Sequence, residues 1–157
     1  MSRAALALAA RRPQRRCGGT LVEFALVAPV VLLLFFAILE LAILFWVSLT
    51  MQHAVREGAR LAVTGAGGAM REALVMDRIA EQSMGLYGLV HPVLHVNGIT
   101  APSDGISPPV GLFGAGGGML LLRLDCRWPV ATPLLRPMLG EAFRFSVAAS
   151  MRNEAFE

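Results

Sequence analysis

The stretch FALVAPVVLLLFFAILELAILFWV, from Phe24 to Val47, decides how this chain is organised. Its only charged residue is Glu40, and its only helix breaker is Pro29. As an α-helix these residues would extend about 36 Å, and the hydrocarbon core of a bilayer is about 30 Å thick. The stretch is therefore predicted to cross a membrane once. A buried core helix is the alternative, but such helices are usually shorter and carry a polar stripe.

The composition also indicates that part of the chain lies in lipid. Of its 157 residues, 55% are hydrophobic and 16% are charged, whereas soluble domains average about 25% charged residues. Intrinsic disorder of the whole chain is excluded, because disorder requires low hydrophobicity and high charge. Two cysteines, Cys17 and Cys126, are too few for a disulfide scaffold. A multi-pass transporter is excluded because one stretch alone is long enough to span.

The charged residues exclude several further classes of protein. The chain has 14 basic residues, and every one is arginine. The absence of lysine excludes a P-loop, Schiff-base chemistry and Ser-Lys catalysis. Five arginines, at positions 3, 11, 12, 15 and 16, lie within residues 1–18, so removing these residues changes the net charge from +3 to −2. The basic charge thus belongs to the N-terminal end and not to a folded surface, and we expect no nucleic-acid partner.

The distribution of arginine also predicts how the span is oriented. RRPQRR, residues 11–16, precedes it, and only Arg56 and Arg60 follow closely. By the positive-inside rule the N-terminus lies in the cytoplasm and residues 51–157 lie outside, which in a bacterium is the periplasm or cell surface. Trp46 fits the aromatic belt at the outer boundary. A cleaved secretory signal is less favoured, because the apolar stretch is too long and no small-x-small cleavage site ends it.

An unusual junction precedes the span. RRCGGTLVEF, from Arg15 to Phe24, is a basic leader that stops at two glycines, with an acid just inside the apolar stretch. A charge at the bilayer centre costs about 2.5–3.5 kcal/mol, and less near an interface, so the acid Glu23 needs a partner or a purpose. The arrangement resembles the type IV prepilin signal, with glycine last in the leader and glutamate fifth in the mature chain. Cleavage between Gly18 and Gly19 satisfies this count, whereas cleavage after Gly19 would make Glu23 the fourth residue.

Further blocks narrow the resemblance to one family. Residues 18–34 (GGTLVEFALVAPVVLLL), 54–65 (AVREGARLAVTG) and, more loosely, SMRNE at 150–154 resemble the TadE-like family of tight-adherence pilus pseudopilins. The resemblance implies a non-enzymatic minor pseudopilin of a Tad/Flp pilus assembly and secretion system in the bacterial inner membrane. It implies no cofactor, and its partners would be membrane lipid, a prepilin peptidase, other pilins or pseudopilins and the Tad inner-membrane assembly machinery. Glu23, followed by Phe24, would pair with the new N-terminal amine of a neighbouring subunit.

Three residues of the span leave alternatives open. Glu23 either makes that pairing, which would set the register between packed helices, or hydrates at the cytoplasmic boundary. Pro29 deprives the carbonyl of Ala25 of its helical partner and predicts a kink, which is either a functional bend in pilin packing or neutral. Glu40, about 25 Å further along the axis than Glu23, is expected either to pair with a neighbouring helix or to be protonated or reach water.

The helix is expected to continue beyond the membrane. Helical propensity persists past Gly58, so one rod should run to about Thr64, where GAGG at 65–68 ends it. This extension carries the motif residues Arg56, Glu57, Gly58 and Arg60. The two arginines are four apart on one face, where they meet solvent, lipid phosphates or acids of another subunit.

We predict an α+β fold in four parts. Residues 1–18 form the basic cytoplasmic leader, 19–50 the transmembrane helix, 51–64 its extension, and 65–157 a small pilin-like extracytoplasmic domain. An amphipathic helix is predicted over 69–83, with Arg71 and Glu72 among the residues outside its apolar stripe.

The remainder of this domain alternates as strands do. Strands are predicted over 86–96, which ends at an Asn97-Gly98 turn, and over 120–128 and 143–150. Loops rich in proline and glycine are expected at 101–118 and 129–140. Residues on one face of the middle strand are Leu122, Leu124, Cys126 and Trp128. About three antiparallel strands against the helix rod would bury a modest core.

The sequence shows no motif for catalysis or metal binding. His91 and His95 are four apart, but a strand would place them about 13 Å apart, too far to share a zinc ion. GAGGG at 114–118 lacks the register and the lysine of a phosphate loop. Cys126 is expected to be unpaired and buried. Two other functions remain as hypotheses: an uncleaved signal-anchor that tethers a periplasmic binding module, and a membrane-anchored hydrolase, which needs a convergent polar site that the sequence does not show.

Overall fold

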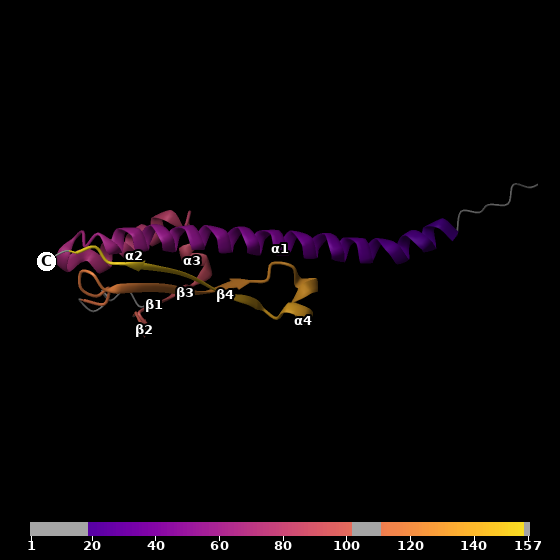
Figure 1. The fold of residues 1–157 in the computed structure, drawn as a ribbon. Helices are drawn as coiled ribbons and strands as arrows, with labels where there is room; N and C mark the ends of the chain where they lie inside the picture. The colour runs from indigo at the N-terminus through magenta and orange to yellow at the C-terminus, as the bar shows by residue number, and fades with distance from the viewer. Residues whose placement is uncertain (1–18, 102–110, 156–157) are drawn as a thin grey trace, which may run out of the picture. The chain divides into compact units, whose positions relative to one another are not determined.

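The chain divides into two compact units, Met1–Phe35 and Phe36–Glu157. A computed structural model describes residues 19–101 and 111–155 (Figure 1). Helix α1 (Gly19–Val63) has 45 residues; it begins in the first unit and ends in the second. The predicted leader, residues 1–18, lies outside the described residues.

In the first unit the described residues are the opening turns of α1. Its large apolar side chains from Leu21 to Phe35 are exposed, and Pro29 lies inside the helix. Within the described part of the chain, α1 is the one helix that is long and apolar enough to cross a membrane, by length and composition. Such apolar character is what a membrane span requires.

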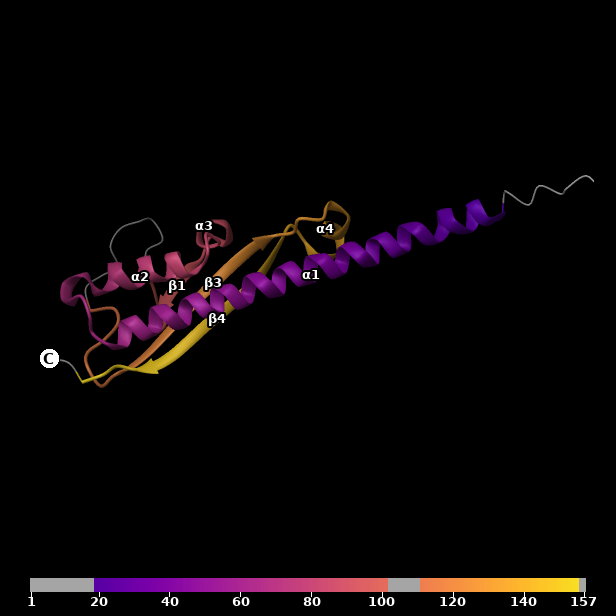
Figure 2. The same ribbon diagram turned by 90° about the horizontal axis from the view of Figure 1, so that it is seen from above.

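The second unit contains a four-stranded antiparallel sheet in the order β2-β1-β3-β4, of which Figure 2 labels β1, β3 and β4. β1 (Val93–Val96) and β2 (Ile99–Thr100) form a short hairpin, and β3 (Met119–Pro129) and β4 (Ala142–Arg152) form a long one. The predicted α+β class is confirmed, with four strands rather than about three. The additional strand is β2, which is two residues long.

One face of the sheet packs against the second half of α1. The alternation predicted for the middle strand is confirmed, because Leu120, Leu122, Leu124 and Cys126 of β3 are all buried. Residues of α1 recur at helical spacing in the same core: Val47, Met51, Ala54, Val55, Ala59 and Ala62. Three of these six are alanines.

Helix α2 (Arg71–Gln82) follows the single-turn helix η1 (Gly68–Met70) and packs on α1 through Val75 and Ile79. The GAGG stop is confirmed, because α1 ends at Val63 and Gly67 has a φ of 94°, which glycine adopts without strain. The prediction was wrong for Arg71 and Glu72, which are only 7% and 5% exposed. Their partners, described below, lie on other segments of the fold.

The strand predicted over 86–96 is correct only in its second half. Tyr87–Val90 forms a short helix, α3, and only β1 is a strand. Leu86 and Val90 are both buried, and a separation of four places them on one face of a helix. A short apolar run fits either structure when periodicity is the only guide. The Asn97-Gly98 turn is confirmed, with φ of 50° and 84° at its two residues, as a type I′ hairpin requires.

The connection between β3 and β4 is more ordered than the predicted loop. It contains η2 (Pro133–Leu135) and α4 (Arg136–Leu139), and we refer to residues 130–140 as the hairpin tip. In both views α4 lies beside α1 (Figures 1 and 2). Two hydrogen bonds from the tip backbone to Glu40 fix this placement within the second unit.

Candidate functional site

The predicted processing site lies where the described chain begins. Gly18 is outside the described residues, and Gly19 is the first residue of α1. Gly19 is exposed, lacks a positive φ, and a Cβ added to it would meet nothing within 4 Å. The described fold therefore gives no reason for a glycine at this position.

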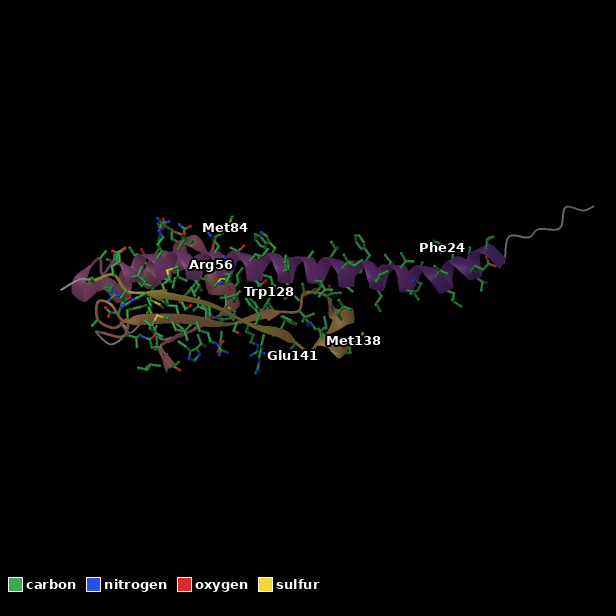
Figure 3. The ribbon with its side chains drawn as sticks, in the orientation of Figure 1. Phe24, Arg56, Met84, Trp128, Met138 and Glu141 are labelled. Carbon is green, nitrogen blue, oxygen red and sulfur yellow. The ribbon has the colours of Figure 1, made fainter. Side chains whose placement is uncertain are left out.

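Glu23 and Phe24 follow in the next turn of α1, and both are exposed (Figure 3 labels Phe24). Within the described part of the chain, the Glu23 carboxylate makes no hydrogen bond or ion pair. An acid in an apolar helix without a partner in its own chain is costly in lipid unless it lies at the interface or meets another chain. The structure thus leaves this carboxylate available.

Glu40 differs from Glu23 because its own chain surrounds it. The residue is 2% exposed. Its carboxylate accepts hydrogen bonds from the Ala131 N–H at 2.9 Å, the Thr132 N–H at 3.1 Å and the Thr132 hydroxyl at 2.8 Å. Hydrogen bonds to a charged group contribute about 1.5–3 kcal/mol each. The expected partners, a neighbouring helix or water, are replaced by donors some 91 residues away in the same chain.

Internal contacts shape the hairpin tip that supplies these donors. The Val130 N–H donates to the carbonyl of Glu141 at 3.0 Å, which closes the end of the long hairpin. The Leu135 N–H donates to the carbonyl of Thr132, also at 3.0 Å. Val130 and Leu135 are both buried. The tip is therefore anchored on both sides of the residues that bind Glu40.

The REGAR motif places its glycine where α2 packs on α1. Gly58 is buried, and a Cβ added there would overlap Cγ1 of Ile79 and lie 2.8 Å from its Cδ1. Arg56 and Arg60 remain exposed, and Glu57 is half-buried (Figure 3 labels Arg56). The glycine thus permits close helix packing, whereas the charged residues of the motif stay at or near the surface.

A shallow groove of about 510 Å³ runs beside this contact. It carries both signs of charge, and Arg78 pairs with Glu81 within it at 2.8 Å. An exposed pair of this kind contributes only a few tenths of a kcal/mol. The lining residues are Glu57, Arg60, Leu61, Thr64, Leu74, Asp77, Arg78 and Glu81. An open surface that mixes charged and apolar groups suits a weak protein contact better than chemistry on a small molecule.

A buried polar cluster closes the C-terminal end of α1. Arg71 Nε donates to the Ala62 carbonyl at 2.8 Å, and Nη2 donates both to that carbonyl and to Asn153 Oδ1, the latter at 3.3 Å. The guanidinium also lies 5.8 Å from the centre of the Phe113 ring. A cation at the last carbonyls of a helix is favourable. Burial lowers the pKa of Arg71 from its usual value, and the neighbouring Glu72 opposes that shift.

The ending SMRNE belongs to the same cluster. The Asn153 N–H donates to Gly118 O at 2.8 Å, and the Glu154 N–H donates to Val63 O at 2.9 Å. The C-terminal residues therefore satisfy a carbonyl that α1 leaves without a helical partner. Glu72 accepts a hydrogen bond at 2.9 Å from the N–H of Gly111, which accounts for its burial.

The sequence analysis missed a polar cluster on the exposed side of the sheet. His95 Nε2 lies 3.2 Å from Asp125 Oδ2, and His95 Nδ1 lies 3.0 Å from Thr100 Oγ1. These residue types also occur in nucleophilic triads. Here, however, Arg123 Nε already donates to Asp125 at 2.8 Å. His95 faces Thr100 and Arg123 in the strand register, so cross-strand pairing accounts for the cluster.

Cys126 occupies the inward face of β3. Burial, with a smaller contribution from Asp125, raises the pKa of its thiol to about 12. The thiolate is the reactive form of cysteine, so this side chain is inert at neutral pH.

Comparison with known proteins gives a family match that covers most of α1. Residues 18–60 match the family described as TadE-like protein. The chain carries a TadE-like segment. The family resemblance drawn from the sequence is thereby confirmed, although no curated protein and no solved structure matches the chain. The TadE-like segment contains the junction glycines, both acids of the apolar stretch and the REGAR residues. The hairpin tip that binds Glu40, and Ile79 that contacts Gly58, lie outside it.

Proposed function

We propose that this protein is a minor pseudopilin of a Tad/Flp pilus assembly and secretion system. It spans the bacterial inner membrane once, with residues 51–157 outside. The TadE-like segment carries the proposal, because residues 18–60 coincide with the apolar part of α1 and its REGAR extension. The role requires a prepilin peptidase, other pilins or pseudopilins and the Tad assembly machinery as partners. It is structural, and it needs no catalytic residue and no cofactor.

Cleavage between Gly18 and Gly19 would make Glu23 the fifth residue of the mature chain. Co-expression of a C-terminally tagged chain with a prepilin peptidase should give a mature protein that begins at Gly19. Gly18→Ala should reduce cleavage, because the resemblance places glycine last in the leader. Gly19→Ala is the matched control and should still be cut, since its Cβ enters open space. An uncut wild-type chain would favour the signal-anchor for a periplasmic binding module, and a cut near residue 50 would indicate a secreted product.

Glu23 is the acid that this role assigns to pairing between subunits. Its carboxylate has no partner in the described part of its own chain, and opposite charges attract strongly in a low-dielectric setting when the geometry is good. Glu23→Gln keeps the shape of the side chain and removes its charge. This variant should be processed normally and should assemble few pili. Glu154→Gln, a control acid outside the apolar stretch whose residue is exposed, should be assembled. Normal piliation by Glu23→Gln would contradict the pairing.

The proposed orientation predicts that the second unit is accessible from outside the cytoplasm. Met84 is exposed in the second unit (Figure 3), so a cysteine there should react with a membrane-impermeant thiol reagent applied to spheroplasts. Labelling that requires permeabilised cells would reverse the proposed orientation.

A further inference from the structure

The hairpin tip and the start of β4 carry exposed apolar side chains. Met138 is 78% exposed (Figure 3), and Leu139 and the adjacent Phe143 are also exposed. Single exposed apolar residues are common on soluble proteins. These side chains, however, belong to the segment that Glu40 binds, beside a helix that is itself apolar and exposed.

The exposed apolar surface of α1 continues past the point where the tip is attached. Within the second unit it includes Leu39 and Leu41 on either side of Glu40, and it extends to Phe45 and Trp46. Glu40 lies six residues, about 9 Å along α1, before Trp46, which fits the aromatic belt at the outer boundary. If α1 spans the bilayer, the turns near Glu40 therefore lie just inside the outer boundary of the hydrocarbon. The tip bound to Glu40 must lie at the same depth.

Several backbone N–H groups of the tip are hydrogen-bonded, as this depth demands. Backbone groups exposed to lipid are costly unless they are hydrogen-bonded. The amides of Ala131 and Thr132 are used by Glu40, and the Gly140 N–H donates to Arg136 O at 2.8 Å. Pro133 and Pro137 have no N–H to satisfy.

Side chains with affinity for headgroups lie in the tip and beside it. Arg127, Arg136 and His91 line a hollow of about 470 Å³ together with Glu141 (labelled in Figure 3). Arginine in this position can meet lipid phosphates, and the carboxylate can meet a headgroup amine. Exposed apolar residues with arginines nearby form the pattern of a segment that lies in the interface.

We propose that the hairpin tip is a second membrane contact, inserted at the boundary between acyl chains and headgroups of the outer leaflet. The occupant of its apolar surface is bilayer lipid. The inference rests on the proposed membrane anchoring. A single span fixes neither the rotation nor the tilt of the second unit, whereas a helix and a tip inserted together restrict both.

Depth-dependent fluorescence quenching tests this contact in the full chain. An environment-sensitive fluorophore is attached through Met138→Cys, in nanodiscs of phosphatidylcholine and phosphatidylglycerol that contain phosphatidylcholine spin-labelled near the top of its acyl chain. The native Cys17 is changed to Ser, and Cys126 stays because its buried thiol does not react. Met119→Cys is the matched control, because Met119 is 69% exposed at the opposite end of the same hairpin. Leu34→Cys reports the insertion of α1 itself.

The expected result is loss of emission at 138 and at 34, with no loss at 119. Loss at 34 without loss at 138 would overturn the tip contact and leave the anchoring intact; this is also the result if another protein covers Met138. No loss at any position would overturn the anchoring together with the tip contact. Loss at all three would show the whole sheet lying on the bilayer, which contradicts a contact confined to the tip.

Discussion

Replacing Gly58 by alanine tests the packing of α2 on α1. The new methyl group would overlap Ile79 Cγ1 and lie 2.8 Å from Cδ1, whereas Cβ of Ile79 is 3.7 Å away. Both residues are buried, so the methyl group has no open space to enter. Alanine favours a helix over glycine by roughly 0.5–1 kcal/mol. An extra methyl group in a packed core costs about 1–3 kcal/mol. We therefore expect Gly58→Ala to destabilise the wild-type background, by up to about 2 kcal/mol.

The effect of Gly58→Ala on stability should change sign when the side chain of Ile79 is shortened. Ile79→Ala deletes Cγ1 and Cδ1, and by itself it should cost about 2–5 kcal/mol, as other large-to-small core changes do. In that background the methyl group of Gly58→Ala fills part of the cavity and keeps its helix propensity. The second change should then stabilise by about 0.5–1 kcal/mol. The double-mutant cycle should therefore give a coupling free energy of about 1–3 kcal/mol, which reports contact between the two sites.

Denaturant unfolding of the full chain in one fixed mild detergent measures all four proteins of the cycle. Near-ultraviolet circular dichroism follows the loss of tertiary packing. Gly88→Ala is the control, because Gly88 lies in α3 and a Cβ there meets nothing within 4 Å. It should be neutral or stabilising. The packing argument fails if Gly58→Ala has the same effect with Ile79 and with alanine at position 79.

Three other changes probe the remaining contacts. Glu40→Ala leaves the amides of Ala131 and Thr132 without their acceptor, so we expect a loss of about 2 kcal/mol or more of local stability, seen as faster hydrogen exchange at those two amides; unchanged exchange would refute the contact. Arg71→Met should cost about 3 kcal/mol in denaturant unfolding, because it removes several charge-assisted hydrogen bonds, and lysine should not restore them. Burial raises the pKa of Cys126 from 9.0 to about 12, so the unfolded chain loses this proton first and stability should fall as pH rises between those values. Cys126→Ala should make that decline shallower in pH-dependent unfolding, and an equally steep decline would refute the shift.

Local sequence signals predicted most of the elements, because each depends on neighbours within a few residues. The end of α1 follows from the glycines at 65–68, and the first hairpin turn follows from Asn97-Gly98. The alternation over 120–128 predicted which face of β3 is buried. The error at Tyr87–Val90 arose because a short apolar run has too few residues to distinguish the two periodicities.

Contacts between different segments of the chain could not be predicted from the sequence. Polarity placed Arg71 and Glu72 on the outside of a helix, but their partners are carbonyl and amide groups on other segments. Glu40 was identified as an acid that needs a partner, yet nothing in the sequence pointed to Thr132. The family resemblance drew attention to Gly58 without its physical reason, which is the position of Ile79.

The two acids of the apolar stretch now differ in what they can still bind. The Glu40 carboxylate accepts hydrogen bonds from two backbone N–H groups and one hydroxyl of its own chain. A neighbouring helix would have to displace all three. The cost of leaving those donors unsatisfied, about 1–3 kcal/mol each, opposes such an exchange. Glu23 is exposed and makes no such bond among the described residues. If one acid of α1 joins neighbouring subunits, the energetics assign that contact to Glu23 and assign Glu40 to holding the hairpin tip.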